Sequence, residues 1–284
     1  MQGRIIKGNG KTYTINSEGH LYDVSLKGTL KKEKTFIAVG DYVEFDEVNL
    51  VIQKVINRTS LLKRPRIANV DQILILHSFI EPDFDLPLVL KYLTYANMND
   101  IKASLVVTKK DKGDFSKQME EIRSAFSMMG IKTYFVNNKS RDGVDELIED
   151  LKRETIVLVG QSGVGKSSLL NAIDSSYKRD EGDYSYSRGR GKHQTTEIVL
   201  LPFNDGFLAD TPGFSDIELN LTKEEAAKFY PGCYQRNAKC FYSNCLHQGE
   251  KKCAVKEAIN IEVPEIIYNE YIKYLSTLPL KERR

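Results

Sequence analysis

The first residues that could do chemistry form a glycine-rich loop, residues 160–167, of the kind that binds nucleotide phosphates. An apolar run, Thr155–Val159, predicts a buried strand before the loop, and a helical pattern follows it. Strand, loop and helix in this order let successive backbone N–H groups converge on phosphates at a helix N-terminus. Lys166 would reach the β- and γ-phosphates, and the Ser167 hydroxyl would ligate Mg²⁺. The predicted phosphate-binding residues are Gly160, Gln161, Ser162, Gly163, Val164, Gly165, Lys166, Ser167 and Ser168.

A second motif, Asp210-Thr211-Pro212-Gly213, follows another apolar run at residues 207–209. In hydrolases with a phosphate loop, an aspartate at such a position holds Mg²⁺ and a glycine N–H senses the γ-phosphate. Asp210 and Gly213 are therefore candidates for catalysis together with Lys166. Taken alone, either this tetrapeptide or the glycine-rich loop could be a chance turn, but their order and spacing support each other.

A base-reading motif, Thr108-Lys109-Lys110-Asp111, directly follows a third apolar run at residues 103–107. A carboxylate here can accept hydrogen bonds from guanine N1–H and N2–H₂, whereas adenine presents an acceptor and the wrong donor. Asp111 therefore predicts selection of GTP over ATP. The alternative is a solvated loop with a helix cap, but the position at the carboxyl end of a strand favours a ligand site.

The order of these motifs is unusual. Asp111 precedes Gly160 by 49 residues, whereas most GTPases have the phosphate loop first and the base-reading motif last. Circular permutation preserves a fold when the original termini lie close together. Its consequence here is that the loop around Asp210 is joined directly to the C-terminal part of the chain.

All four cysteines fall in one C-terminal stretch: Cys233, Cys240, Cys245 and Cys253. With His247, the last three give the soft ligand set that Zn²⁺ prefers in closed tetrahedral sites. We therefore expect one structural Zn²⁺ per chain, with Cys233 as a small buried hydrophobic residue. Two disulfides are the alternative, which cytosolic reducing conditions disfavour.

The wider pattern predicts the elements that position these residues. Short runs with period-two alternation near the N-terminus predict a small antiparallel barrel, and the polar, basic residues 58–66 predict a linker. From Asp71, apolar runs alternate with amphipathic segments, which is typical of a largely parallel sheet with helices on both faces. Thr222 predicts a helix N-cap. Strands are expected over 4–7, 11–15, 21–26, 40–45, 51–56, 73–76, 103–107, 133–136, 156–159, 198–201 and 207–209, and helices over 86–98, 115–129, 144–152 and 263–275.

Composition bounds the possible classes of protein. The 284 residues, 41% hydrophobic and 28% charged, can bury a core across two or three compact units. A net charge of +2 is too small to indicate nucleic-acid binding by itself. No apolar run reaches the length of a membrane span and no secretory leader is evident, so we expect a cytoplasmic protein without membrane contact.

Residues 160–168, 190–193, 210–214 and 240–247 with Cys253 resemble the ribosome small subunit-dependent GTPase A family, RsgA, and the resemblance covers nearly the whole chain. It implies a multidomain α/β protein. An OB-like, RNA-binding barrel would span residues 1–66, a circularly permuted GTPase domain 67–220, and a zinc-binding helical domain 221–284. It also implies a late step in small ribosomal subunit assembly, with GTP hydrolysis stimulated by the subunit, and we expect a monomer.

Three positions depart from the family pattern. Thr108 stands where many GTPases have Asn, so a side-chain amide that braces the pocket is missing, although Thr is also tolerated in this family. Residues 136–140 stand where the family usually has Ser-Ala, which leaves the last guanine-contacting loop open. Gln194 occupies a position where threonine is common, which leaves open whether Thr195 or Thr196 meets Mg²⁺.

Basic residues form local clusters: Lys27, Lys31, Lys32 and Lys34; Lys63, Arg64 and Arg66; Arg188, Arg190 and Lys192. Each cluster could be a solvated loop. A basic rim on an OB-like barrel is also a common RNA-binding surface, and the resemblance favours ribosomal RNA as the partner.

Phe214 follows Gly213 where Ras-like enzymes have a water-orienting glutamine. We therefore hypothesise that intrinsic hydrolysis is slow and that His193 completes the catalytic site when a partner orders its loop. The alternative is that His193 contacts only RNA or solvent.

Two competing functions remain open from the sequence. The first is an RNA-binding assembly factor that uses GTP only as an affinity switch. The second is a P-loop ATPase or small-molecule kinase, for which Asp111→Ala would leave nucleotide preference unchanged.

Overall fold

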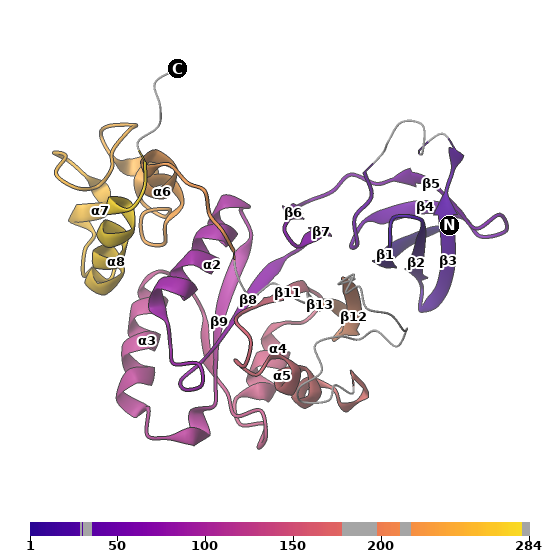
Figure 1. The fold of residues 1–284 in the computed structure, drawn as a ribbon, viewed down its shortest axis with the longest axis horizontal. Coiled ribbons are helices and arrows are strands. Elements are labelled where there is room, and N and C mark those ends of the chain that lie inside the picture. The colour runs from indigo at the N-terminus through magenta and orange to yellow at the C-terminus, as the bar shows by residue number, and fades with distance from the viewer. Residues whose placement is uncertain (29, 31–35, 178–197, 211–216, 280–284) are drawn as a thin grey trace.

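The computed structural model describes residues 1–28, 30, 36–177, 198–210 and 217–279. A barrel at one end, a central sheet with helices, and a helical C-terminal unit at the other end follow one another across the molecule (Figure 1). Among the described residues, no helix is both long and apolar enough to cross a membrane.

The N-terminal barrel closes on itself, because the strand order β1-β2-β3-β5-β4 ends with β4 pairing back to β1. Alternate residues such as Ile15, Val43 and Phe45 point into its core. The pairings are antiparallel except that of β3 with β5, which is parallel. The predicted barrel is thus confirmed. Its strands are β1 (Gln2–Gly8), β2 (Thr12–Ser17), β3 (His20–Leu26), β4 (Tyr42–Asp46) and β5 (Val51–Val55).

The stretch predicted as a linker contains structure of its own. Strands β6 (Leu61–Lys63) and β7 (Arg66–Ala68) form a two-stranded antiparallel sheet. Leu62 and Ile67, which pair across it, are both fully buried in the central core. The segment predicted as a linker thus carries a small sheet, because these two apolar side chains pack it into the core.

The central sheet is parallel across the order β10-β9-β8-β11-β13, and β12 pairs antiparallel with β13. All seven residues of β8 are buried, as expected for a strand covered on both faces. A single pairing of Lys7 with Val199 joins β1 to β12, so the barrel and the central sheet are continuous. The strands are β8 (Gln72–Ser78), β9 (Lys102–Thr108), β10 (Thr133–Phe135), β11 (Thr155–Val159), β12 (Val199–Phe203) and β13 (Gly206–Asp210).

Helices cover both faces of this sheet, as predicted. Ile73 and Ile75 of β8 share a core with α2 and α3, while Leu74 and Leu76 share a separate core with α4 and α5. The alternation along one strand therefore separates the two layers. The helices are α2 (Leu86–Met98), α3 (Ser116–Met128), α4 (Val144–Asp150) and α5 (Lys166–Ile173), with short 3₁₀ turns η1 (Lys110–Lys112), η2 (Ser175–Tyr177) and η3 (Asn237–Lys239).

The C-terminal unit consists of α6 (Lys223–Phe229), α7 (Ala254–Glu257) and α8 (Glu265–Ser276). Thr222 caps α6 in a reciprocal capping box with Glu225, which confirms the predicted N-cap. The unit packs on α2, where the Asn97 side chain donates to the Phe229 carbonyl at 2.8 Å. Its apolar residues belong to the same core as α2 and α3, so the two units are firmly joined.

Arg4 contacts both the barrel and the central sheet. Its buried guanidinium contacts the rings of Tyr42 in the barrel and Phe207 in β13, 4.9 Å and 4.8 Å from their centroids. It also donates to the carbonyls of Gly40 and Asn69. The barrel is thereby tied to β13, the strand that ends at Asp210.

Candidate nucleotide and metal sites

The glycine-rich loop connects β11, which lies between β8 and β13, to α5. Gly160 begins the loop with a φ of 151°, and a Cβ there would lie 2.3 Å from the Leu76 carbonyl oxygen of β8. Only glycine fits so close to a neighbouring strand. The loop ends at Gly165, whose φ of 91° is again one that glycine favours. The predicted order of strand, loop and helix is present.

Lys166 is the first residue of α5, and its side chain folds back over the loop. The Nζ group donates to the carbonyl of Gly160 and, at 2.7 Å, to that of Gln161. These bonds hold the ammonium group on the concave side of the loop, where a phosphate would bring negative charge.

The base-reading motif begins where β9 ends. Thr108 is fully buried, and its Oγ1 donates to the carbonyl of Val164 in the phosphate loop at 2.6 Å. A hydroxyl at this position therefore makes the supporting hydrogen bond to the phosphate loop that an asparagine amide would otherwise make. Lys109 takes a left-handed conformation with a φ of 60°, which turns the chain into η1 and presents Asp111 at the sheet edge.

A cleft of about 450 Å³ brings the two motifs together. Asp111 and Lys109 line it from one side, and Gln161, Lys166 and other loop residues line it from the other. The volume is in the range of small-molecule sites. Its lining comprises Glu81, Lys109, Asp111, Lys112, Asn137, Asn138, Lys139, Gln161, Ser162, Gly163, Gly165, Lys166, Ser167 and Ser168.

Some predicted residues lie outside the cleft lining. Thr108, Gly160 and Val164 are not among its lining residues, and Lys110 forms an ion pair with Asp142 at 2.7 Å. Lys110 therefore does not line the cleft, although the sequence grouped it with Asp111.

The loop after β10 lines the cleft, although the sequence left its role open. Asn137 shapes this loop, because its Oδ1 accepts from the N–H groups of Lys139 at 2.9 Å and Ser140 at 3.3 Å. The next side chain, Asn138, donates from Nδ2 to the Gly165 carbonyl at 3.1 Å. The sequence indicated this loop in two ways: residues 136–140 stand where the family has its last guanine-contacting loop, and strand ends in a parallel sheet gather at one edge.

Several residues proposed for catalysis or for Mg²⁺ binding lie outside the described residues: Gly213, Phe214, His193, Thr195 and Thr196. Six residues of the basic clusters also lie outside them: Lys31, Lys32, Lys34, Arg188, Arg190 and Lys192. The backbone of Asp210 is described as the last residue of β13. Because Ala209 pairs with Val157 of β11, Asp210 follows at the edge of the sheet where β11 leads into the phosphate loop.

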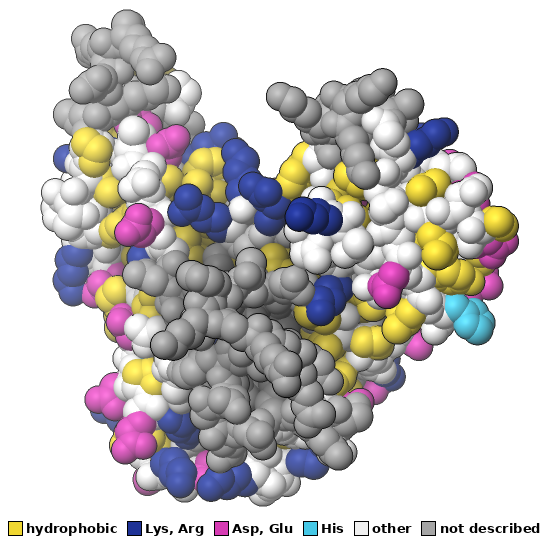
Figure 2. Space-filling view, turned by 45° about the vertical axis from the view of Figure 1, so that its right-hand side comes forward, with side chains coloured by type: hydrophobic (Ala, Val, Ile, Leu, Met, Phe, Trp, Pro, Cys, Tyr) yellow, Lys and Arg dark blue, Asp and Glu magenta, His cyan; other side chains and the backbone are white. Residues whose placement is uncertain are grey.

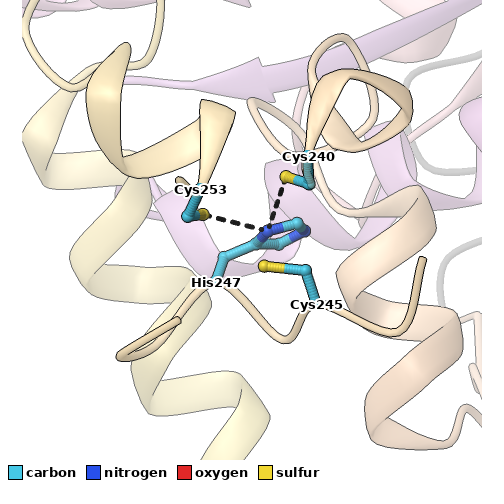
Figure 3. Close-up of side chains that lie close together, drawn as sticks. All are labelled: Cys240, Cys245, His247 and Cys253. Carbon is cyan, nitrogen blue, oxygen red and sulfur yellow. Dashed lines mark hydrogen bonds between the residues drawn. The ribbon is translucent and has the colours of Figure 1, made fainter. Parts of the chain in front are cut away.

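The predicted metal ligands form a compact cluster in the C-terminal unit (Figure 3). Their ligand atoms all lie within 4.8 Å of one another, and they belong to Cys240, Cys245, His247 and Cys253. His247 Nδ1 is 3.6 Å from Cys240 Sγ and 3.4 Å from Cys253 Sγ. Tetrahedral Zn²⁺, with bonds of about 2.3 Å to sulfur and about 2.0 Å to nitrogen, separates such atoms by about 3.5 Å. The residues present therefore fit zinc.

The surroundings of the cluster orient its ligands. His247 Nε2 lies 3.0 Å from the Ala227 carbonyl, so a proton on Nε2 leaves Nδ1 free to bind metal. Burial lowers the pKa of His247, which favours the neutral ring. Burial also raises the pKa of the Cys245 thiol to about 12, and a bound cation would favour the thiolate. Cys233 is buried in the adjacent core and is not one of the clustered ligands.

Three features meet at one edge of this parallel sheet. The phosphate loop follows β11, the neighbouring strand β13 ends at Asp210, and β9 is followed by Asp111. That arrangement defines a P-loop GTPase with its strands in permuted chain order. Family models agree: the RsgA GTPase model matches residues 55–220, and the RsgA N-terminal domain model matches residues 2–50. The chain belongs to the RsgA GTPase family.

Relatives and solved structures resemble the chain over its whole length. A protein of Shouchella clausii named small ribosomal subunit biogenesis GTPase RsgA is 36% identical, with 100% of this chain and 99% of that protein covered. A Listeria monocytogenes protein named small ribosomal subunit biogenesis GTPase RsgA 2 is 37% identical, with the same coverage. The structure of YjeQ from Thermotoga maritima matches with a TM-score of 0.80 and 31% identity, covering 100% and 99% of the two chains. That of YloQ, described as a circularly permuted GTPase, matches with a TM-score of 0.78 and 30% identity, covering 97% and 93%. The predicted permutation is confirmed.

Proposed function

We propose that the cleft binds GTP. The observation that carries this proposal is that Asp111 and the phosphate loop, far apart in the sequence, line one cleft. The Asp111 carboxylate would accept from guanine N1–H and N2–H₂, while loop N–H groups and Lys166 would bind the phosphates. Ser167 and Asp210 would hold the Mg²⁺ that accompanies GTP in GTPases, together with Thr195 or Thr196.

We infer that this chain hydrolyses GTP to GDP and phosphate during late assembly of the small ribosomal subunit, with stimulation by that subunit. The names of its full-length relatives support this partner. Lys166 and Gly213 would stabilise charge on the γ-phosphate, and His193 would complete the site when the subunit binds. The chain would act as a monomer in the cytoplasm.

The chain would bind ribosomal RNA through basic residues beside the barrel. Lys63, Arg64 and Arg66 are exposed beside the barrel, and Arg66 lies 4.7 Å over the ring of Phe36. On the face seen in Figure 2, Lys and Arg side chains gather between the barrel and the C-terminal unit. Basic and aromatic groups of this kind bind RNA backbone and bases.

The C-terminal cluster would hold one structural Zn²⁺. Three thiolates and one imidazole at the observed separations support this metal. We assign residues 1–66 to the barrel, 67–220 to the GTPase domain and 221–284 to the zinc-binding domain, although β7 crosses the first of these boundaries.

Phosphate release measured with purified small subunits, and separately with large subunits, tests this function. We expect turnover to rise with small subunits only. GTP binding without stimulation by either subunit would instead favour a factor that uses GTP as an affinity switch.

A further inference from the structure

Two hydrogen bonds join the base side of the cleft to the phosphate loop. Thr108 Oγ1 donates to the Val164 carbonyl at 2.6 Å, and Asn138 Nδ2 donates to the Gly165 carbonyl at 3.1 Å. Thr108 is the last residue of β9 and Asn138 lies in the loop after β10, yet the two side chains donate to consecutive carbonyls. The loop is therefore held at two adjacent peptide groups.

These bonds fix the direction of the opposite ends of the same peptides. In a trans peptide the N–H points away from the carbonyl. The Val164 carbonyl shares its peptide with the N–H of Gly165, and the Gly165 carbonyl shares its peptide with the N–H of Lys166. N–H groups at this part of a glycine-rich loop are those that converge on phosphate. Holding the carbonyls thus aims the N–H groups into the cleft.

The Asn138 amide is fixed in orientation by its surroundings. A reversed amide would place Oδ1 against the Gly165 carbonyl, so that two acceptors would face each other. A Cβ on Gly165 would lie 3.2 Å from Asn138 Nδ2 and 3.5 Å from Thr108 Oγ1, which shows how closely both donors converge there. Asn138 Oδ1 is buried and accepts no hydrogen bond from the described residues. The donor end of the amide is therefore the end that contacts the loop.

We propose that Asn138 is a positioning residue for nucleotide binding. Its amide, acting with the Thr108 hydroxyl, holds the phosphate loop in its binding shape and supplies from a second loop the amide that position 108 lacks. This rests on the proposed nucleotide site. Because Asn138 acts through the loop, its loss weakens GTP and GDP binding alike and leaves kcat at saturating GTP unchanged.

The experiment compares nucleotide affinity and turnover in four variants. Asn138→Ala removes the whole amide, Asn138→Asp keeps an oxygen acceptor but loses the donor, and the double variant Thr108→Asn with Asn138→Ala moves the amide to position 108. Ser140→Ala, in the same loop, is the control. Melting temperature without nucleotide checks folding.

We expect Asn138→Ala to weaken GTP and GDP binding about fivefold, the effect of one neutral hydrogen bond. Asn138→Asp should weaken them by about tenfold or more, because a carboxylate oxygen then faces the Gly165 carbonyl. The double variant should recover affinity to within about twofold of wild type.

Wild-type affinity in Asn138→Asp would overturn the proposal, because the donor would then have no role. A fall in kcat at unchanged KM in Asn138→Ala would also overturn it. If the alanine variant fails to fold, the aspartate and double variants make the same comparison. Failure of the wild-type chain to bind GTP would instead contradict the proposed function.

Discussion

Replacing Asp111 with asparagine should change which base the cleft prefers. Guanine presents two donors, N1–H and N2–H₂, to the carboxylate, whereas xanthine has a carbonyl in place of the 2-amino group. Asparagine offers one acceptor and one donor with the shape of aspartate. Asp111→Asn should therefore weaken GTP binding and favour xanthosine triphosphate.

The size of the effect follows from the position of Asp111. Its side chain is exposed at the cleft and makes no hydrogen bond or ion pair that involves the described residues, so the change should hardly affect folding. Charge-assisted hydrogen bonds contribute about 1.5–3 kcal/mol each, and exposure favours the lower figure. Asp111→Asn loses one of these bonds, leaves the other as a neutral bond and sets the Nδ2 donor against a guanine donor. Together these changes should cost about 3 kcal/mol, or about two orders of magnitude in the Kd for GTP.

Competition of GTP, ATP and xanthosine triphosphate for the cleft measures this change. Asp142→Asn is a matched control, because Asp142 is an exposed carboxylate nearby that pairs with Lys110 outside the cleft. We expect the control to keep its preference for GTP. An Asp111→Asn variant that still prefers GTP would refute the assignment of Asp111 to base recognition.

Three further predictions concern the metal cluster, the contacts of Arg4 and acid stability. Cys245→Ser should abolish zinc binding, whereas Cys233→Ala should retain one Zn²⁺ per chain. Metal analysis of the purified variants measures this difference. Equal metal content in both variants would contradict the ligand assignment. Arg4→Ala should lower the free energy of unfolding by about 2–3 kcal/mol, because it removes two hydrogen bonds and two ring contacts. Denaturant titrations measure this change. A change below about 0.5 kcal/mol, which is typical of surface sites, would contradict the prediction. Burial lowers the pKa of His77, whose neutral Nδ1 accepts from the Ser78 N–H at 2.9 Å. As pH falls below about 6.5, His77 takes up a proton more readily in the unfolded chain than in the folded chain. The free energy of unfolding should therefore decrease below that pH. His77→Gln should make this decrease smaller.

Much of the fold could be predicted because the relevant signals are local. The glycine-rich loop carries its own backbone geometry, and the continuous apolar run of β8 indicates a strand covered on both faces. The ligand cluster was also predictable, because three cysteines and one histidine lie within 14 residues of one another. Thr222 and Glu225 form the capping box that their spacing indicates.

The features that could not be predicted from the sequence depend on contacts between segments far apart in the chain. Leu62 and Ile67 are too few to give a strand pattern, and only the core into which they pack explains β6 and β7. Arg4 gave no signal, because Phe207 lies about two hundred residues away in the chain. Asn138 likewise contacts Gly165 only because β10 and β11 end at the same edge of the sheet.

GTP turnover by the purified chain, followed as small ribosomal subunits are added, tests whether the subunit stimulates hydrolysis. Large subunits and the Lys166→Ala variant serve as controls. We expect a rate that increases and saturates with small subunits, stays low with large subunits and is lost in the variant. A rate unaffected by small subunits, or equally increased by both, would contradict this expectation.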